Sequence, residues 1–562
     1  MTRWLLAISA IAIGLGCGGA QTVRPDPGSA WPDFADAFID AYFEIEPSYA
    51  VWSGRHEFDG RLPDWSAAGV ARSAHALRDW RGRALAFEAS ALSADERLER
   101  EHLVAVTDDW LFWNVRAKQL ERNPAAYRGA LSPSVYLTLP YAPLEERMRA
   151  FVRYQQAVPA AVAQLRENLR TPLPRTYVEL GLSFFGGLAS YFESDVPGIF
   201  AGVEDEALQQ RFAASNRKAA ASMRAVEAWL RAELARATDD FALGAELFSE
   251  MLWSTERVDI PLDELKRMGN ADLERNLAAI RAACAQVTPG QSIPKCVETM
   301  QADKPAAGPV AGATQQLAAL KAFVQREDVV SIPGTEDALV AEAPPYQRSN
   351  AAYIEIPGPY EKDLPATYYI APPDPAWSEA EQRAYLPGRA DLMFVSIHEV
   401  WPGHFLQFLH ANRSSSRIGR VFVGYAFAEG WAHYSEELMW ELGFGDGDPK
   451  LHVGQLINAL LRNVRLLSAI GLHTGDMTVA ASEAMFREMA YQDPGNARQQ
   501  AARGTYDPAY LNYTLGKLLI RELRDDWSAR RGGRAAWKAF HDALLAHGGP
   551  PLPLLRAQLL AD

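Results

Sequence analysis

Two histidines and a glutamate lie close together in the segment Ser396-Ile-His-Glu-Val-Trp-Pro-Gly-His404. Neutral imidazole nitrogens and carboxylate oxygens are the ligands that zinc takes in catalytic sites. Two histidines four positions apart on a helix share one face and can bind a single ion. His398 and His404 are six positions apart, so an ideal helix would separate them by a rotation of about 240° and a rise of about 9 Å. A regular helix therefore cannot bring both imidazoles to one ion.

A Pro-Gly pair directly precedes the second histidine. Pro402 removes a helical hydrogen-bond donor, and Gly403 accepts backbone angles that other residues avoid. A bulge at this pair would absorb the two additional residues and place His404 beside His398. The alternative is a helix that ends at Pro402 and leaves two unrelated histidines.

A third ligand is expected from the aromatic segment that follows. Glu429 lies 25 positions after His404, which leaves room for a loop and a returning helix. Gluzincin enzymes take a glutamate ligand from such a helix, and two histidines with one carboxylate leave a coordination position open to water, as in a catalytic zinc site. Glu399, next to the first ligand, would be the general base. This pattern predicts metal-assisted hydrolysis.

Two further polar residues follow Glu429 on the same expected helix. His433 and Glu437 lie four and eight positions after it. They would orient the ligands by hydrogen bonding, or they are polar residues at the rim of the site.

The HExxPGH and EGWAxYxE runs and the C-terminal segments together resemble the bacterial family DUF885, which is regarded as a family of gluzincin-type zinc metallopeptidases. The resemblance covers most of the mature chain and is most specific between about residues 340 and 525. It implies a mainly helical fold, related to thimet-oligopeptidase-like and carboxypeptidase-Taq-like enzymes, with an active-site groove between helical halves. It also implies Zn²⁺ held by His398, His404 and Glu429, with Glu399 as base and a peptide as substrate.

Two later segments also match the family pattern. Arg465 and His473 lie in an R-x-x-x-x-x-GLH-like run, and Arg503 and Tyr513 lie in elements of the R-x-x-x-x-P and Y-x-x-G type. The resemblance implies that Arg465 and Arg503 bind substrate, and that Tyr513 and His473 donate hydrogen bonds to the oxyanion. The alternatives are structural salt bridges for the two arginines and a packed aromatic residue for the tyrosine. Tyr510, in place of an expected Gln, departs from the pattern.

The elements that position these residues are expected to be mainly helices. Apolar residues recur at helical spacing in five long segments, 67–88, 94–120, 144–169, 205–237 and 262–284. Residues 288–313 are rich in Pro, Gly and Gln and are expected to form an exposed loop. Short β-type runs bounded by Pro and Gly lie within 329–375 and predict a small β element. The expected fold is thus mainly α, a large gluzincin-like helical body with this β element.

The chain is expected to divide into four parts. Residues 1–17 have a basic Arg3, a short apolar stretch and small residues before Cys17, which is typical of a lipoprotein signal with a lipidated Cys17. An ordinary secretory signal is the alternative. A tether would follow at 18–30, a helical scaffold at 31–328 and a catalytic half at 329–562. Export to the periplasm or to an outer-membrane anchor follows, with the lipid as the sole membrane contact.

The two remaining cysteines, Cys284 and Cys296, flank a turn-rich segment. In an oxidising compartment such a pair is expected to form a disulfide, and the alternative is two unpaired thiols.

Composition narrows the class of partner. The formal net charge of −14 disfavours binding to phosphate backbones, so no nucleic acid is expected. Three hypotheses remain: a zinc peptidase for short peptides, a zinc amidohydrolase for non-peptide amides, and a non-catalytic envelope lipoprotein that binds a partner.

Overall fold

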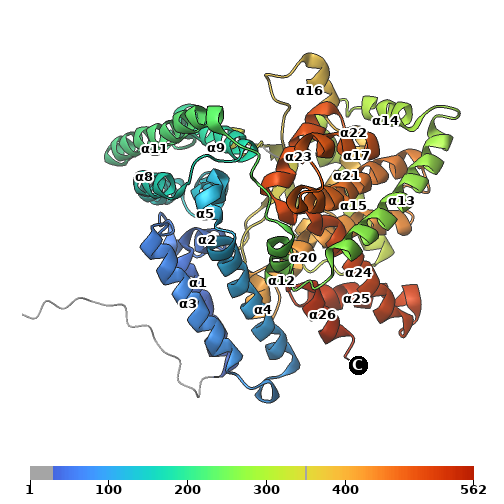
Figure 1. Cartoon of the computed structure of the whole chain (residues 1–562), viewed down its shortest axis with the longest axis horizontal. Coiled ribbons are helices and arrows are strands. Elements are labelled where there is room, and N and C mark those ends of the chain that lie inside the picture. The colour runs from blue at the N-terminus through green and yellow to red at the C-terminus, as the bar shows by residue number, and fades with distance from the viewer. Residues whose placement is uncertain (1–29, 349–350, 562) are drawn as a thin grey trace, which may run out of the picture.

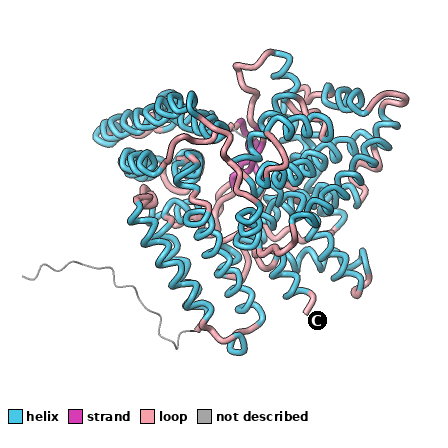
Figure 2. Tube along the Cα trace, in the orientation of Figure 1, coloured by secondary structure: helices cyan, strands magenta, loops and turns pink. Residues whose placement is uncertain are grey.

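A computed structural model describes residues 30–348 and 351–561, and within them the chain is almost entirely helical. The mainly α fold with one small sheet is therefore confirmed. The helices form two lobes that lie side by side in Figure 1, with the sheet between them (Figure 2). We call α1–α11 the N-terminal lobe, and α12–α26 with the sheet the C-terminal lobe.

The N-terminal lobe contains two groups of long antiparallel helices. Its helices are α1 (Trp31–Ile45), α2 (Pro47–Trp52), α3 (Ala67–Leu85), α4 (Ala94–Leu111), α5 (Gln119–Arg122), α6 (Arg128–Leu131), α7 (Ser134–Thr138), α8 (Leu144–Asn168), α9 (Arg175–Ser194), α10 (Val196–Ile199) and α11 (Glu206–Glu233).

The C-terminal lobe contains the remaining helices and all strands. They are α12 (Ala245–Glu256), α13 (Leu262–Val287), α14 (Ile293–Ala302), α15 (Gly308–Glu327), β1 (Ala338–Glu342), β2 (Ala352–Glu355), β3 (Ala366–Ile370), α16 (Glu379–Tyr385), α17 (Arg389–Glu399), α18 (His404–Ala411), α19 (Arg417–Val421), α20 (Tyr425–Glu441), α21 (Pro449–Thr474), α22 (Val479–Met489), α23 (Pro494–Tyr506), α24 (Asn512–Ala529), α25 (Trp537–Leu545) and α26 (Leu552–Leu559).

Local signals explain where several long helices begin and end. A reciprocal pair of hydrogen bonds between Ser93 and Glu96 caps the start of α4. The helix expected over 94–120 is shorter than the periodicity suggested, because a π-helical turn follows Leu111 and Lys118 adopts a left-handed φ of 50°. The other four helices expected from periodicity correspond to α3, α8, α11 and α13.

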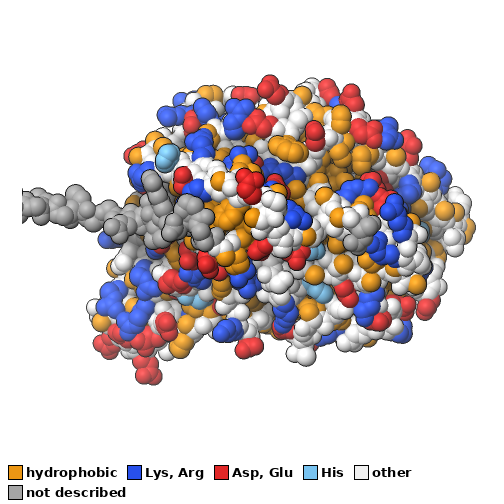
Figure 3. Space-filling model, turned by 90° about the horizontal axis from the view of Figure 1, so that it is seen from below, with side chains coloured by type: hydrophobic (Ala, Val, Ile, Leu, Met, Phe, Trp, Pro, Cys, Tyr) orange, Lys and Arg blue, Asp and Glu red, His pale blue; other side chains and the backbone are white. Residues whose placement is uncertain are grey.

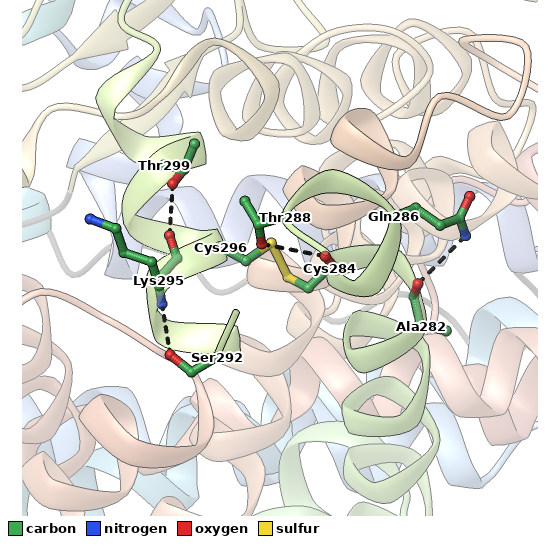
Figure 4. The surroundings of a disulfide bond; sticks show 8 residues. All are labelled: Ala282, Cys284, Gln286, Thr288, Ser292, Lys295, Cys296 and Thr299. Atoms are coloured by element: carbon green, nitrogen blue, oxygen red, sulfur yellow. Dashed lines mark hydrogen bonds between the residues drawn. A yellow bond between two sulfur atoms is a disulfide. The ribbon is translucent and has the colours of Figure 1, made fainter. Parts of the chain in front are cut away.

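The loop expected over 288–313 is wrong, because α14 and the start of α15 lie within it. The Ser292 hydroxyl accepts a hydrogen bond from the Lys295 amide and begins α14, and Pro294 lies in the first turn, where no helical donor is lost. A proline at this position starts a helix instead of ending one. The disulfide between Cys284 and Cys296 is present, with a Cα–Cα distance of 5.7 Å, and it joins α13 to α14 (Figure 4).

The β element expected within 329–375 is a three-stranded sheet of order β1-β3-β2. Strands β1 and β3 are parallel, with Ala338 opposite Ala366, whereas β2 and β3 are antiparallel, with Ala352 opposite Ile370. The central strand is the most buried of the three. Tyr368 on this strand packs into the core that also contains the helices of the metal centre described below.

The hydrophobic cores do not divide at residue 328. One core contains the buried residues of α12–α14 together with those of α21 and α24. The core of the N-terminal lobe in turn takes up Ile418, Val421 and Phe422, from α19 and its end. Phe422 stacks on Tyr49 with ring centroids 5.8 Å apart, and the Tyr49 hydroxyl donates to the Val421 carbonyl over 2.6 Å. A short segment of the C-terminal half is thus anchored in the opposite lobe.

The predicted signal, the lipidation site at Cys17 and nearly all of the tether lie outside the described residues. Among the residues that are described, no helix is both long and apolar enough to cross a membrane. On the face shown in Figure 3, acidic and basic side chains are interspersed.

Candidate metal centre

The segment between the two histidines is a break between two helices. Helix α17 ends at Glu399 and α18 begins at His404, with a cis peptide bond between Trp401 and Pro402. The indole nitrogen of Trp431 donates to the Pro402 carbonyl over 2.8 Å and holds the turn. The rings of His398 and His404 lie 4.8 Å apart between centroids, at 87° to each other. The Pro-Gly pair therefore brings the imidazoles together by ending one helix and starting another, and not by a bulge within one.

At this turn, Gly403 cannot be replaced by a residue with a side chain. Its amide donates to the Ile397 carbonyl over 3.0 Å, which folds the turn back on α17. A Cβ atom at this position would lie 1.8 Å from the carbonyl oxygen of His398. Such a contact is far shorter than atoms tolerate, so the close approach of the two histidines depends on glycine.

Glu429 on α20 completes the set of ligands. Its Oε2 atom lies 3.2 Å from Nε2 of His398 and 3.2 Å from Nε2 of His404. One ligand atom from each of the three residues can be chosen so that all lie within 4.8 Å of one another. Two imidazole nitrogens and one carboxylate oxygen are the donor set of a catalytic zinc site. The residues present therefore fit the metal that the sequence implied.

The second ring nitrogen of His398 is held by a carboxylate that the sequence analysis missed. Nδ1 of His398 lies 2.7 Å from Oε1 of Glu436, which also forms an ion pair with Nη2 of Arg462 at 3.0 Å. A carboxylate at Nδ1 keeps the proton there and leaves Nε2 as the lone-pair donor. Burial alone would raise the pKa of Glu436, but the charge of Arg462 and the hydrogen bonds outweigh it and hold that pKa well below its usual range. Glu436 lies seven positions after Glu429, two full turns on the same face, and this spacing could have identified it.

The two expected orienting residues lie next to this carboxylate. Nδ1 of His433 is 3.4 Å from Oε2 of Glu436, so His433 supports the site indirectly. Glu437 faces away from the ligands and pairs with Arg275 and Lys517 at 2.9 and 3.4 Å. These contacts connect α20 to α13 and α24, which makes Glu437 a structural residue.

Glu399 lies beside the first ligand at the end of α17 and is 6% exposed. Burial raises the pKa of its carboxyl, although the neighbouring imidazoles of His398 and His404 oppose the shift. A carboxyl with a raised pKa next to a metal centre is suited to accept and return a proton.

Tyr513 lies against the first ligand because two helices pack unusually closely. Its ring stacks on His398 at 5.9 Å between centroids and 14° between planes. A Cβ atom on Gly430 of α20 would lie 2.5 Å from the Cα of Gly516 on α24. Glycine on both helices therefore permits the backbone approach that brings Tyr513 to the ligands.

Three arginines surround the Tyr513 ring, and two of them are the predicted substrate-binding residues. The guanidinium carbon of Arg465 lies 4.5 Å from the ring centroid, and its Nε donates to Gln500 over 2.8 Å. Arg503 donates from Nη2 to the Tyr513 hydroxyl over 3.2 Å and from Nε to Asp507 over 2.9 Å. Nη1 of Arg503 is buried and has no hydrogen-bond partner among the described residues. Arg465 thus positions the tyrosine, whereas Arg503 has a donor to spare.

The structure corrects the role expected for His473. Its Nε2 is bonded to the Gly504 carbonyl at 2.8 Å, and its Nδ1 accepts from the Leu243 amide at 3.3 Å. Burial lowers its pKa to about 4, so the ring is neutral. Both nitrogens serve the backbone, and neither is left for an oxyanion. The GLH run therefore fastens α21 to neighbouring segments.

A cleft of about 650 Å³ reaches the candidate ligand Glu429. Glu429 and Arg503 of the C-terminal lobe line it together with Gln119 and Asn123 of the N-terminal lobe. Tyr353 of the edge strand β2 also contributes to the wall. The site is thus a groove with polar groups from both lobes.

Comparisons with known proteins identify a family and solved structures of similar fold. The model of a family described as "Bacterial protein of unknown function (DUF885)" matches residues 47–559. A comparison with curated proteins finds no match. Among solved structures, a candidate lipoprotein of unknown function from Shewanella oneidensis is 23% identical with a TM-score of 0.76, covering 95% of this chain and 100% of its own. A candidate lipoprotein from Colwellia psychrerythraea is 16% identical with a TM-score of 0.78, covering 94% of this chain and 98% of its own.

Proposed function

This chain belongs to the DUF885 family, and we propose that it is an exported zinc-dependent peptidase that hydrolyses short peptides. One observation carries the proposal: His398, His404 and Glu429 converge, Glu429 also lines the cleft, and the buried Glu399 directly follows His398 in the chain. A structural zinc site has four protein ligands, whereas three protein ligands leave a position for water and substrate.

Zn²⁺, when bound by these three residues, would polarise the scissile carbonyl and lower the pKa of a water molecule. Glu399 would take a proton from the water as its oxygen attacks the carbonyl carbon. Glu399 would then give that proton to the amide nitrogen as the C–N bond breaks, which yields a carboxylic acid and an amine. Glu436 and Arg462 would hold His398 in the orientation it needs during both steps.

The developing negative charge on the carbonyl oxygen would be stabilised beside the ligands. The Tyr513 hydroxyl is a hydrogen-bond donor at this location, and the surrounding arginines favour negative charge. Burial raises the pKa of Tyr513, although Arg503 and Arg465 oppose the shift, so the phenol keeps its proton. The free Nη1 of Arg503 is suited to a substrate carboxylate or carbonyl in the cleft.

The shape of the cleft supports short peptides as substrates. Its walls come from both lobes and from the sheet, so a substrate must enter between them. An extended peptide fits between two walls, whereas a folded protein does not. The exported location rests on the lipoprotein-type start of the chain, ending at Cys17, and on the description of the two solved relatives as candidate lipoproteins.

The test compares the wild-type protein with Glu399→Gln on a mixed peptide pool, with products identified by mass spectrometry. We expect the wild type to bind about one equivalent of zinc and to generate new peptides. Glu399→Gln should keep the zinc and lose at least about 10³-fold in rate, since the proton acceptor is gone. His398→Ala should lose both zinc and activity. Identical products from wild type and Glu399→Gln would refute catalysis.

A non-catalytic lipoprotein that binds a partner in the cleft is the second candidate, and the description of both solved relatives as candidate lipoproteins, one of them of unknown function, favours it. This candidate predicts that no zinc binds at any pH and that no peptide is cleaved. A third arm with small acyl amides would detect an amidohydrolase that spares peptides.

A further inference from the structure

A second, smaller cavity adjoins the catalytic cleft. It has a volume of about 270 Å³ and shares Trp113, Tyr425 and Ala509 with the lining of the cleft. Tyr425 is the first residue of α20 and lies one turn before the ligand Glu429. The cavity is therefore within reach of a substrate whose scissile bond lies at the metal centre. We refer to it as the side cavity.

A buried carboxyl, that of Glu256, lies in the wall of the side cavity. Glu256, at the end of α12, is 2% exposed, and its Oε1 accepts from the Ala426 amide over 3.0 Å. Its Oε2 is buried and has no hydrogen-bond partner among the described residues. A Cβ atom on Gly424, which also lines the cavity, would lie 3.4 Å from this oxygen. An unpaired carboxyl oxygen inside a protein is costly unless a ligand supplies the missing donor.

A second carboxyl, that of Asp109, lines the same cavity, and no lysine or arginine does among the described residues. The nearby Arg257 is already engaged, since its Nη2 donates to Asp108 over 2.7 Å and its Nη1 to the Trp253 carbonyl over 3.0 Å. Burial raises the pKa of Glu256 to about 8 and that of Asp109 to about 7. Burial raises both pKa values by more than the neighbouring hydrogen bonds and, for Asp109, the charge of Arg257 lower them.

Much of the remaining wall of the side cavity is aromatic, and the buried His102 and small or aliphatic residues complete it. The aromatic side chains are Tyr42, Tyr49, Trp113, Phe422 and Tyr425. Aromatic faces attract ammonium groups and also pack against an alkyl chain. The combination of two carboxyls with five aromatic side chains matches an alkylammonium group better than any anion or neutral polar group.

We propose that the side cavity is a substrate subsite that binds an ammonium group of a peptide, contributed either by a lysine side chain or by the free amino terminus. This inference rests on the proposed peptidase function. It names the substrate class, which is peptides with a positively charged group close to the scissile bond, and it names Glu256 and Asp109 as the specificity-determining residues.

Four peptides of equal length and of the same neutral background test the proposal. They carry either lysine or acetyl-lysine next to the cleaved bond, each with a free or an acetylated amino terminus. We expect the wild type to prefer a peptide that keeps the recognised ammonium group by tenfold or more in kcat/KM, through a lower KM. Comparing lysine with acetyl-lysine peptides, and free with acetylated amino termini, shows which of the two ammonium groups the subsite binds.

Three variants link the preference to the cavity. Glu256→Gln should bring the ratio of kcat/KM for charged and neutral peptides close to one, since the amide still accepts from the Ala426 amide but has no charge. Gly424→Ala should lower the same ratio, because its methyl group would enter the cavity without a backbone clash. Glu250 forms an ion pair with Arg116 on the outer face of α12, so Glu250→Gln should leave the ratio unchanged.

Failure of the subsite and failure of the peptidase give different results. Equal cleavage of charged and acetylated peptides by the wild type, or an unchanged preference in both cavity variants, would overturn the subsite while leaving the peptidase intact. If no peptide is cleaved, the subsite can still be tested by binding. Calorimetry then measures the affinity of the Glu399→Gln protein for the lysine peptide and for its fully acetylated analogue. Binding of the charged peptide at least tenfold tighter, lost in the double variant with Glu256→Gln, supports the subsite, and equal affinity rejects it.

Discussion

The orientation of one imidazole depends on a chain of charged residues behind it. Glu436 holds Nδ1 of His398, and Arg462 holds Glu436. All three side chains are buried. Such an arrangement would fix which ring nitrogen is free to bind a metal ion. The affinity for zinc should therefore depend on a residue that does not touch it.

Glu436→Gln should weaken zinc binding about 10- to 100-fold, because the amide is a poorer acceptor for the Nδ1 proton. A competition titration against a chelator measures the effect. Glu437→Gln, the neighbouring buried carboxylate, is the matched control and should lower the free energy of unfolding through its lost pairs with Arg275 and Lys517. Equal zinc affinities for wild type and Glu436→Gln would show that the contact has no role in binding.

Tyr513→Phe should lower kcat about 10²- to 10³-fold with zinc content unchanged, since one oxyanion donor is removed. Steady-state kinetics with an atomic-absorption measurement of zinc would check both parts. A lower kcat/KM that results only from a higher KM, with kcat preserved, would instead assign the tyrosine to substrate binding.

Residue types and spacing predict the ligands better than they predict the residues around them. The set His398, His404 and Glu429 has a recognisable pattern along the chain, and the structure brings all three together. The role of Glu436 depends on which face of α20 meets α17. The spacing of seven residues indicates that Glu436 shares a face with Glu429, but it does not tell which element that face contacts. His473 has a chemically suitable side chain, yet its environment is set by contacts with Leu243 and Gly504 that are remote in sequence.

At the scale of elements, the site depends on two places where backbones approach closely. One is the turn at Gly403 between α17 and α18, and the other is the contact of Gly430 with Gly516 between α20 and α24. Helical periodicity predicts most of the long helices but not these approaches. The misassigned segment around α14 shows the same limit, because Pro294 reads as a helix breaker until its position in the first turn is known.

Gly403→Ala should reduce zinc occupancy and peptide cleavage by at least tenfold, because the added methyl group would overlap the His398 carbonyl and push the two imidazoles apart. Gly82→Ala is the matched control. Gly82 lies in α3, and a Cβ atom there would have no other atom within 4 Å. Alanine should therefore stabilise the helix by about 0.5–1 kcal/mol and leave zinc occupancy unchanged. Full zinc occupancy in Gly403→Ala would mean that the turn tolerates a side chain.

At the scale of the whole molecule, several buried histidines affect how the fold responds to acid. Burial lowers the pKa of His541 to about 4 and that of His102 to about 3, against about 6.5 in an unfolded chain. His541 connects Val329 to Tyr434 by hydrogen bonds of 2.8 and 2.7 Å. These rings are neutral in the folded protein, so the unfolded chain takes up protons first as the pH falls.

The free energy of unfolding should therefore be independent of these groups above about pH 6.5 and should fall between pH 6.5 and about 4, by on the order of 1–3 kcal/mol for each imidazole. Chemical denaturation at a series of pH values measures the slope. His541→Phe should be less stable at pH 7 but show a shallower slope, and the exposed His75→Gln should leave the slope unchanged. An unchanged slope in His541→Phe would exclude this group as the cause.

The path of the chain between the second and third ligands carries a last consequence. From His404 it crosses to the opposite lobe, is anchored there by Phe422 against Tyr49, and returns to Glu429. A fragment that starts near residue 329 would keep all three ligands in its sequence and still lose the anchor that spaces them. By the same route, if the lobes open or close to admit a substrate, the movement would shift His404 relative to Glu429, so substrate entry would be coupled to the affinity of the proposed site for zinc.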